Sequence, residues 1–119
     1  MQKIIIQGEL CDLNTYINTT RANKFASAKI KKEQTNYVWG CCKEQGAKPI
    51  KDYPIMISFK WFVKNKRKDP DNVCFQKKWI MDGLVLAGVI ENDTMEFIEG
   101  FQDSFEVDKE NPRIEITLF

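Results

Sequence analysis

The chain has 119 residues, 43% of them apolar and 29% charged, a composition typical of one folded domain and unlike that of a disordered chain. It contains no histidine, which excludes Ser–His–Asp and Cys–His catalysis as well as histidine-ligated zinc or iron sites. No apolar run approaches the roughly 20 residues of a transmembrane helix, and the N-terminal MQKIIIQGEL is a poor signal peptide, so we expect a cytoplasmic protein with no membrane partner.

The net charge of +1 conceals an uneven distribution along the chain. Residues 1–68 hold 14 Lys and Arg against 5 Asp and Glu, a net +9, whereas residues 69–119 hold 4 against 12, a net −8. This asymmetry favours a polyanionic partner for the first half. The same charge counts are also explained if the two halves attract each other within one fold or within a dimer. The four cysteines form no CxxC pair and are expected to be reduced, partly buried thiols.

The first half of the chain is predicted to form a strand, a helix and a second strand. Residues 3–10 form a short β-branched run that predicts a strand. Residues 12–45 lack proline and predict one long helix, which Asp12 or Asn14 could cap and whose buried stripe would include Phe25. Residues 55–64 alternate bulky side chains and predict a long strand.

The second half predicts a helix and then two strands. Residues 72–89 read as a helix that ends at Gly88, and Gly83 inside it indicates a close contact with another element. Residues 95–108 and 112–119 predict strands, which we expect to pair antiparallel with each other. The order β-α-β-α-β-β predicts a single α+β domain over residues 1–119, with a small mixed sheet packed with two helices.

The segment KRKDPDNVCF (66–75) places two aspartates beside a basic run. Pro70 favours an extended conformation for Asp69, in which residues two apart share a side, so Asp69 and Asp71 would aim their carboxylates at one point. After the second helix, Asp93, or else Glu91, could fold back toward the same point. Three carboxylates suit Mg²⁺, with Mn²⁺ also possible, and such an ion can polarise a phosphodiester.

Each of these residues also has a structural interpretation. Asp, Pro and Asn in the order D-P-D-N are common in turns and helix caps. Lys78, two helical turns beyond Asp71, would return to a similar helix face, but it could also pair with Asp82 at i+4.

The basic residues near the aspartates are candidates for contacts with DNA phosphates, which bind lysine and arginine without reading sequence. Each of these residues could instead be an ordinary surface residue that contacts only solvent. The candidates are Lys64, Lys66, Arg67, Lys68 and Lys77, with Arg21, Lys24 and Lys31 on the long helix as a second group.

Three segments together resemble the RusA family of Holliday-junction resolvases: RKDPDNV (67–73), KKWIMDGLVLAGVIENDT (77–94) and, less specifically, PRIEITLF (112–119). The resemblance implies a metal-dependent homodimeric endonuclease that nicks four-way DNA junctions symmetrically. It also implies that Asp69, Asp71 and Asp93 hold the metal ion, and that Lys78 stabilises charge on the phosphate.

The chain departs from the family pattern in three places. About three extra residues precede the lysine, so Lys77 competes with Lys78 for the catalytic role. Asn92-Asp93 stands where the family often has two adjacent acids, and the proline-rich N-terminal loop of the family is missing. Two alternatives therefore stay open: a non-cleaving structure-selective DNA-binding module, and a nuclease with a broader range of branched DNA substrates.

Overall fold

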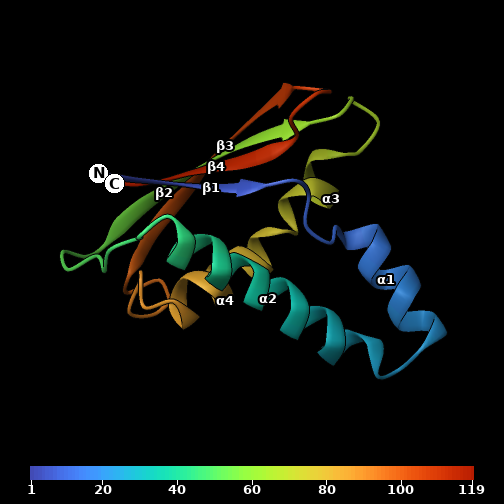
Figure 1. Ribbon diagram of the computed structural model, residues 1–119, viewed down its shortest axis with the longest axis horizontal. Coiled ribbons are helices and arrows are strands. Elements are labelled where there is room, and N and C mark those ends of the chain that lie inside the picture. The colour runs from blue at the N-terminus through green and yellow to red at the C-terminus, as the bar shows by residue number, and fades with distance from the viewer.

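Four strands form one mixed sheet, and the helices lie against one of its faces (Figure 1). The computed structural model describes all 119 residues and has the predicted α+β fold. The elements are β1 (Gln2–Gln7), α1 (Leu13–Ala22), α2 (Ala26–Glu44), β2 (Ile55–Val63), α3 (Pro70–Cys74), α4 (Lys77–Leu86), β3 (Ile98–Val107) and β4 (Arg113–Leu118). None of the helices is both long and apolar enough to cross a lipid bilayer.

The strand order is β1-β4-β2-β3, which corrects the predicted pairing of the last two strands. β4 lies antiparallel to both β1 and β2, whereas β3 runs parallel to β2 at the edge of the sheet. The segment 108–112 therefore passes over the end of β2 instead of closing a hairpin. β4 therefore lies inside the sheet, and its alternating Ile114, Ile116 and Leu118 are buried in the core.

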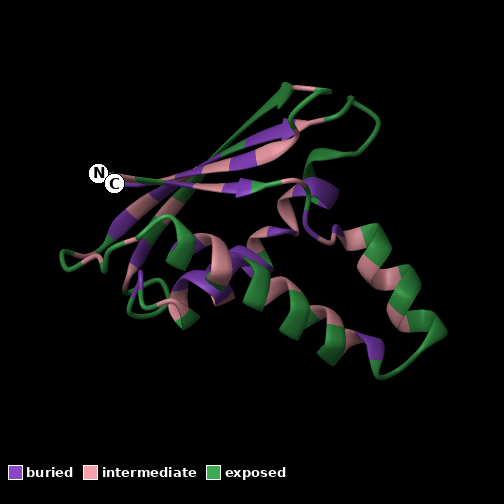
Figure 2. Ribbon diagram, viewed as in Figure 1, coloured by how far each residue is buried: buried purple, intermediate pink, exposed green.

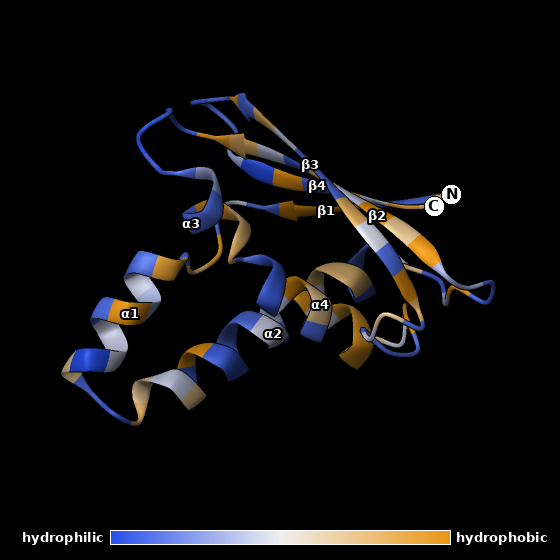
Figure 3. Ribbon diagram, turned by 180° about the vertical axis from the view of Figure 1, so that it is seen from behind, coloured by the Kyte–Doolittle hydropathy of each residue, from blue (hydrophilic) through white to orange (hydrophobic).

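A single hydrophobic core lies between the sheet and the helices α2 and α4 (Figure 2). Trp61, Trp79 and Leu84 are almost fully buried in it. Hydrophobic residues dominate α4, whereas α1 is mixed in character and buries no residue (Figure 3). The core therefore fixes β2 and α4, the two elements that flank the aspartate motif.

The predicted long helix is divided into α1 and α2 at Asn23 to Phe25. Asn23 is extended (φ −150°, ψ 115°), and its side-chain oxygen accepts a hydrogen bond from the Phe25 amide at 2.9 Å. This local bond offers the backbone an alternative to the helical pattern, which is common for asparagine. Phe25 is consequently 72% exposed at the turn and does not join the buried stripe.

The second predicted helix is also divided, into α3 and α4, by a tight turn at Phe75 and Gln76. Both residues keep helical dihedral angles, but the amides of Lys78 and Trp79 bond three residues back, to Phe75 and Gln76. The buried Gln76 side chain accepts a bond from the Leu10 amide at 2.8 Å, which ties this turn to the segment after β1. The helix ends as predicted, with Gly88 at φ +73°.

Candidate functional site

Asp69 and Asp71 flank Pro70 where the loop after β2 enters α3. Asp69 is extended (φ −72°, ψ 150°), as predicted, but Pro70 already begins the helix, so the expected extended alternation stops there. Asp69 occupies the N-cap position without a side-chain capping bond, and Asp71 lies in the first turn. Both residues are exposed, and neither carboxylate forms a hydrogen bond or an ion pair with another residue of the chain.

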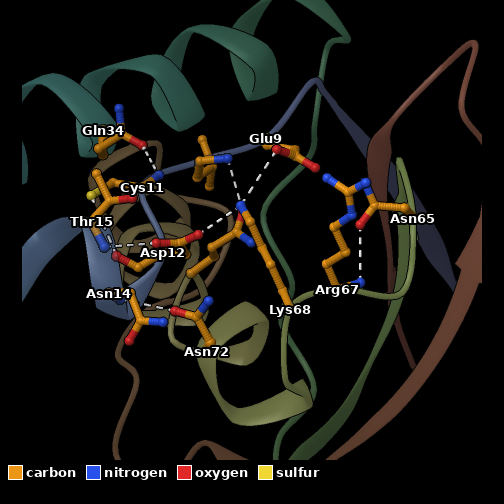
Figure 4. A network of polar contacts seen from close by, with 12 residues as sticks. Glu9, Cys11, Asp12, Asn14, Thr15, Gln34, Asn65, Arg67, Lys68 and Asn72 are labelled. Atoms are coloured by element: carbon orange, nitrogen blue, oxygen red, sulfur yellow. Dashed lines mark hydrogen bonds and ion pairs between the residues drawn. The ribbon is translucent and has the colours of Figure 1, made fainter.

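Asn72, the last residue of D-P-D-N, has a structural role. It is only 6% exposed, and its side-chain oxygen accepts a hydrogen bond from the Asn14 amide at 2.9 Å (Figure 4). This bond joins the start of α3 to the start of α1. Asn72 therefore fixes the start of α3, where the two aspartates lie.

Lys68 is held in an ion-pair network beside the motif (Figure 4). Its ammonium lies 2.6 Å from the buried carboxylate of Asp12 and 3.7 Å from Glu9. Asp12 caps α1, as predicted, by accepting a bond from the Thr15 amide at 2.9 Å. Burial raises the pKa of Asp12, but the bonds from Lys68 and Thr15 outweigh this and leave the pKa below its ordinary value. Lys68 therefore anchors the loop to α1.

We predict that Asp12→Asn lowers the free energy of unfolding by about 1 kcal/mol at neutral pH. Asparagine is as good an N-cap as aspartate, so the variant loses the charge opposite Lys68 and keeps the cap. Because the folded pKa of Asp12 is lowered, its contribution is present above the ordinary carboxyl pKa of about 4 and is lost as the pH falls below it. Urea unfolding at pH 7 and pH 3 checks this; an equal difference at both pH values would contradict it.

The two adjacent lysines at the start of α4 point to different surroundings. The Lys77 ammonium lies 2.6 Å from the Asp103 carboxylate and 4.7 Å from the centre of the Phe101 ring, facing the sheet. Lys78 is half exposed and lies 3.3 Å from Asp82, the i+4 pair that was the structural alternative. It borders a surface hollow with Tyr16 and residues of α2, away from the sheet.

The Cys74 thiol lies between these charged groups and is not ionised. Burial first, and the Asp103 and Asp71 carboxylates in addition, raise the pKa of its thiol to about 11, while Lys77 opposes them. The thiol is thus neutral near pH 7, and burial likewise raises the pKa of Cys42 to about 11. The cysteines of this region are not activated nucleophiles.

Asp103 belongs to this region and was not identified from the sequence. It lies on β3 opposite Phe59 of β2, and its carboxylate accepts bonds from the Trp61 indole at 2.8 Å and from Lys77 at 2.6 Å. One acidic residue in an exposed strand carries no recognisable signal. Only the parallel pairing of β3 with β2 brings it to Lys77.

Asp93 lies at the other end of the sheet from Asp69 and Asp71. The loop that contains it is joined to the start of β2, since the Glu91 amide bonds the Tyr53 hydroxyl and the Ile55 amide bonds the Phe97 carbonyl. The motif follows the opposite end of β2, whose nine residues span roughly 26 Å at about 3.3 Å per residue. Magnesium ligands lie about 2 Å from the ion, and within one chain Asp93 does not lie beside Asp69 and Asp71.

No group of three or more acidic, cysteine or histidine side chains in the chain is arranged to hold a metal ion. Glu91, the alternative to Asp93, is in the same distant loop. Asp69 and Asp71 stay neighbours at the start of α3, as its N-cap residue and a residue of its first turn.

The basic candidates fall into two groups. Lys64, Lys66 and Arg67 are exposed in the loop that leads to Asp69, and none of them pairs with a carboxylate. The second group lies on the arm that α1 and α2 form, separate from this loop: Arg21 ends α1, Lys24 is in the turn and Lys31 is on α2, all exposed. The loop therefore supplies the free cations nearest in sequence to the two aspartates.

A comparison with models of known protein families found no match, and a search of curated proteins also found none. The resemblance to the RusA family consequently rests on the motifs of the sequence alone.

Proposed function

We propose that the chain is a divalent-metal-dependent endonuclease that cuts branched DNA, with the four-way junction as its main substrate. The observation that carries this proposal is the state of Asp69 and Asp71. Two exposed carboxylates without any partner in the chain, at the end of a loop with three unpaired cations, are unexplained by helix capping. They are suited to bind a cation beside a phosphate.

The two aspartates fit Mg²⁺ or Mn²⁺ as a pair. Magnesium is commonly bound through one or two carboxylates together with waters and substrate phosphates, and does not require a complete protein cage. When bound, such an ion polarises a phosphodiester and lowers the pKa of its bound water. Asp69 and Asp71 would hold it, while the buried Asn72 fixes the start of α3, where they lie.

The cations around the motif would position the substrate. Lys64, Lys66 and Arg67 are free to contact phosphates of a duplex arm, which releases counterions and adds affinity without sequence preference. Lys77 and Lys78 both stay candidates for stabilising charge on the phosphate, since each is paired with one carboxylate of the chain, Lys77 with Asp103 at 2.6 Å and Lys78 with Asp82 at 3.3 Å.

The proposed enzyme acts as a homodimer, since two symmetry-related sites can cut opposing strands of a junction. The dimer also gives Asp93 a possible part in the site. Because Asp93 and the Asp69–Asp71 pair lie at opposite ends of the sheet, Asp93 can approach such a pair only on a second copy.

A substrate panel tests this function against its two alternatives. The protein is incubated with a labelled four-way junction, a flap and a duplex of matched sequence, each with Mg²⁺, Mn²⁺ or EDTA. We expect metal-dependent cutting that is fastest on the junction. Equal cutting of the flap would favour a nuclease with broader substrates, and binding of the junction with no cutting in either metal would favour a non-cleaving module.

A further inference from the structure

The arm that α1 and α2 form carries charge of one sign. Between Asp12 and Glu33 the chain has five cations, all of them exposed, and no acidic residue. The five are Arg21, Lys24, Lys29, Lys31 and Lys32. Only Lys29 is near a carboxylate, that of Glu33 at 3.9 Å. A surface of this kind attracts a polyanion by charge complementarity.

An aromatic ring lies at the tip of the arm. Phe25, in the turn between α1 and α2, is 72% exposed and is the most exposed aromatic side chain of the protein. Its ring does not belong to the hydrophobic core, and the Lys24 ammonium lies 5.1 Å from the ring centre. Leaving so large an apolar group in water does not stabilise the fold, so the ring is available to a partner.

The turn holds the backbone of Phe25 in place. The Phe25 amide donates to the Asn23 side chain at 2.9 Å, and the Ala26 amide donates to the Asn23 carbonyl at 3.1 Å. Ala26, the next residue, is buried. Because the backbone is fixed on both sides of the ring, a partner that binds the ring does not have to order the turn first.

The base of the arm is anchored beside the aspartate motif, and the arm extends away from the sheet (Figure 1). The Tyr16 ring packs against those of Phe75 and Trp79, with ring centres 5.4 and 5.6 Å apart, and the Asn14 amide donates to Asn72 at 2.9 Å. The ten residues of α1, at about 1.5 Å per residue, place the tip about 15 Å from this base. That is the length of about four or five base pairs, so one DNA molecule can contact both the motif and the tip.

We propose that Phe25 stacks on a base that is exposed at the branch point of the DNA, while the cations of the arm contact the flanking phosphates. Aromatic rings beside lysine and arginine are a common platform for unstacked bases. Inside a duplex each base is covered by its neighbours, whereas at a branch point a base stack ends. A duplex therefore offers the arm phosphates but no base face. The choice of branched DNA as the partner rests on the proposed function.

An anionic lipid surface would attract the same cations, but the arm has no apolar face to insert into it. The apolar residues of α1, namely Leu13, Tyr16 and Ile17, are all partly buried by the rest of the chain. Phe25 is thus alone at the tip, and one ring buries too little apolar area for stable attachment to a membrane. The combination of many cations with a single exposed ring favours a nucleic acid.

Fluorescence anisotropy in EDTA tests the proposal apart from cutting, with a labelled four-way junction and a duplex of matched sequence. Phe25→Ala should raise the dissociation constant for the junction at least about fivefold and leave that for the duplex unchanged, whereas Phe25→Trp should keep both. Arg21→Ala should weaken binding of junction and duplex alike, because it removes a phosphate contact. Trp39→Ala is the matched control: Trp39 is 42% exposed on α2, away from the tip, and its replacement should change neither constant.

Wild-type junction affinity in Phe25→Ala, or an equal loss on junction and duplex, would overturn the stacking contact. Circular dichroism establishes that the variant is folded. A junction with 2-aminopurine at the branch point gives a second readout, since its fluorescence should change when the wild type binds and not when Phe25→Ala binds. Binding to anionic vesicles with none to DNA would also overturn the proposal.

These results are separate from cutting. A protein that needs Phe25 to bind the junction and never cuts it contradicts the nuclease and leaves the stacking contact standing. A protein that cuts the junction while Phe25→Ala binds as the wild type does contradicts only the stacking contact.

Discussion

Replacement of Asp69 or Asp71 by asparagine is expected to lower the rate of junction cleavage by at least about 100-fold. Asparagine keeps the shape of the side chain but lacks the charge that a hard divalent ion requires. Because neither carboxylate bonds to any other residue of the chain, the change should leave the melting temperature within a few degrees of the wild type. Single-turnover cleavage in Mg²⁺, with junction binding measured in EDTA, separates chemistry from affinity.

Asp52→Asn is the matched control for this experiment. Asp52 is likewise exposed and without a partner, but it lies in the loop before β2, at the other end of the sheet. Its replacement should leave cleavage unchanged. If Asp69→Asn and Asp71→Asn cut DNA at the wild-type rate, the aspartates would have no catalytic role and would serve only to form the turn before α3.

The second large effect is expected at Gly83, where α4 crosses α2. A Cβ atom added there would collide with the side chain of Val38 and lie 3.2 Å from the Thr35 carbonyl oxygen. Val38 is fully buried and cannot move aside without displacing its neighbours. Gly83→Ala should therefore lower the free energy of unfolding by about 1–3 kcal/mol in urea titrations, despite the better helix propensity of alanine.

Gly40→Ala, within α2, is the contrasting variant. No atom lies within 4 Å of the Cβ that it would add, so only the backbone effect operates, and we expect it to stabilise the protein by about 0.5–1 kcal/mol. If both variants were stabilising, the close contact between α2 and α4 would be wrong, and with it the position of Lys77.

Features with a local cause could be predicted from the sequence. Some of these features depend on neighbouring residues in the chain, namely the alternation in residues 55–64 and the cap at Asp12. Others depend on glycine's lack of a side chain, namely the turn at Gly88 and the tight contact at Gly83. The break between α1 and α2 at Asn23 was not predicted from the sequence. Its cause is one hydrogen bond from the Phe25 amide to the Asn23 side chain, which competes only weakly with helix formation.

The parts of the site that depend on tertiary pairing could not be predicted. Asp93 was expected beside Asp69 because a loop can fold back in either direction, and only the length of α4 and its course along the sheet decide where the loop lies. The same applies to Asp103, which reaches Lys77 through the parallel pairing of β3 with β2. The motif identified the two aspartates, but not the residues around them.

The most direct test of the central claim is the mapping of nicks in a synthetic four-way junction, with each strand labelled in turn. The account predicts nicks at matching positions of two opposing strands, present with Mg²⁺ or Mn²⁺ and absent with EDTA. Junction that stays uncut in both metals, although the protein binds it, would contradict the claim that Asp69 and Asp71 hold a catalytic ion.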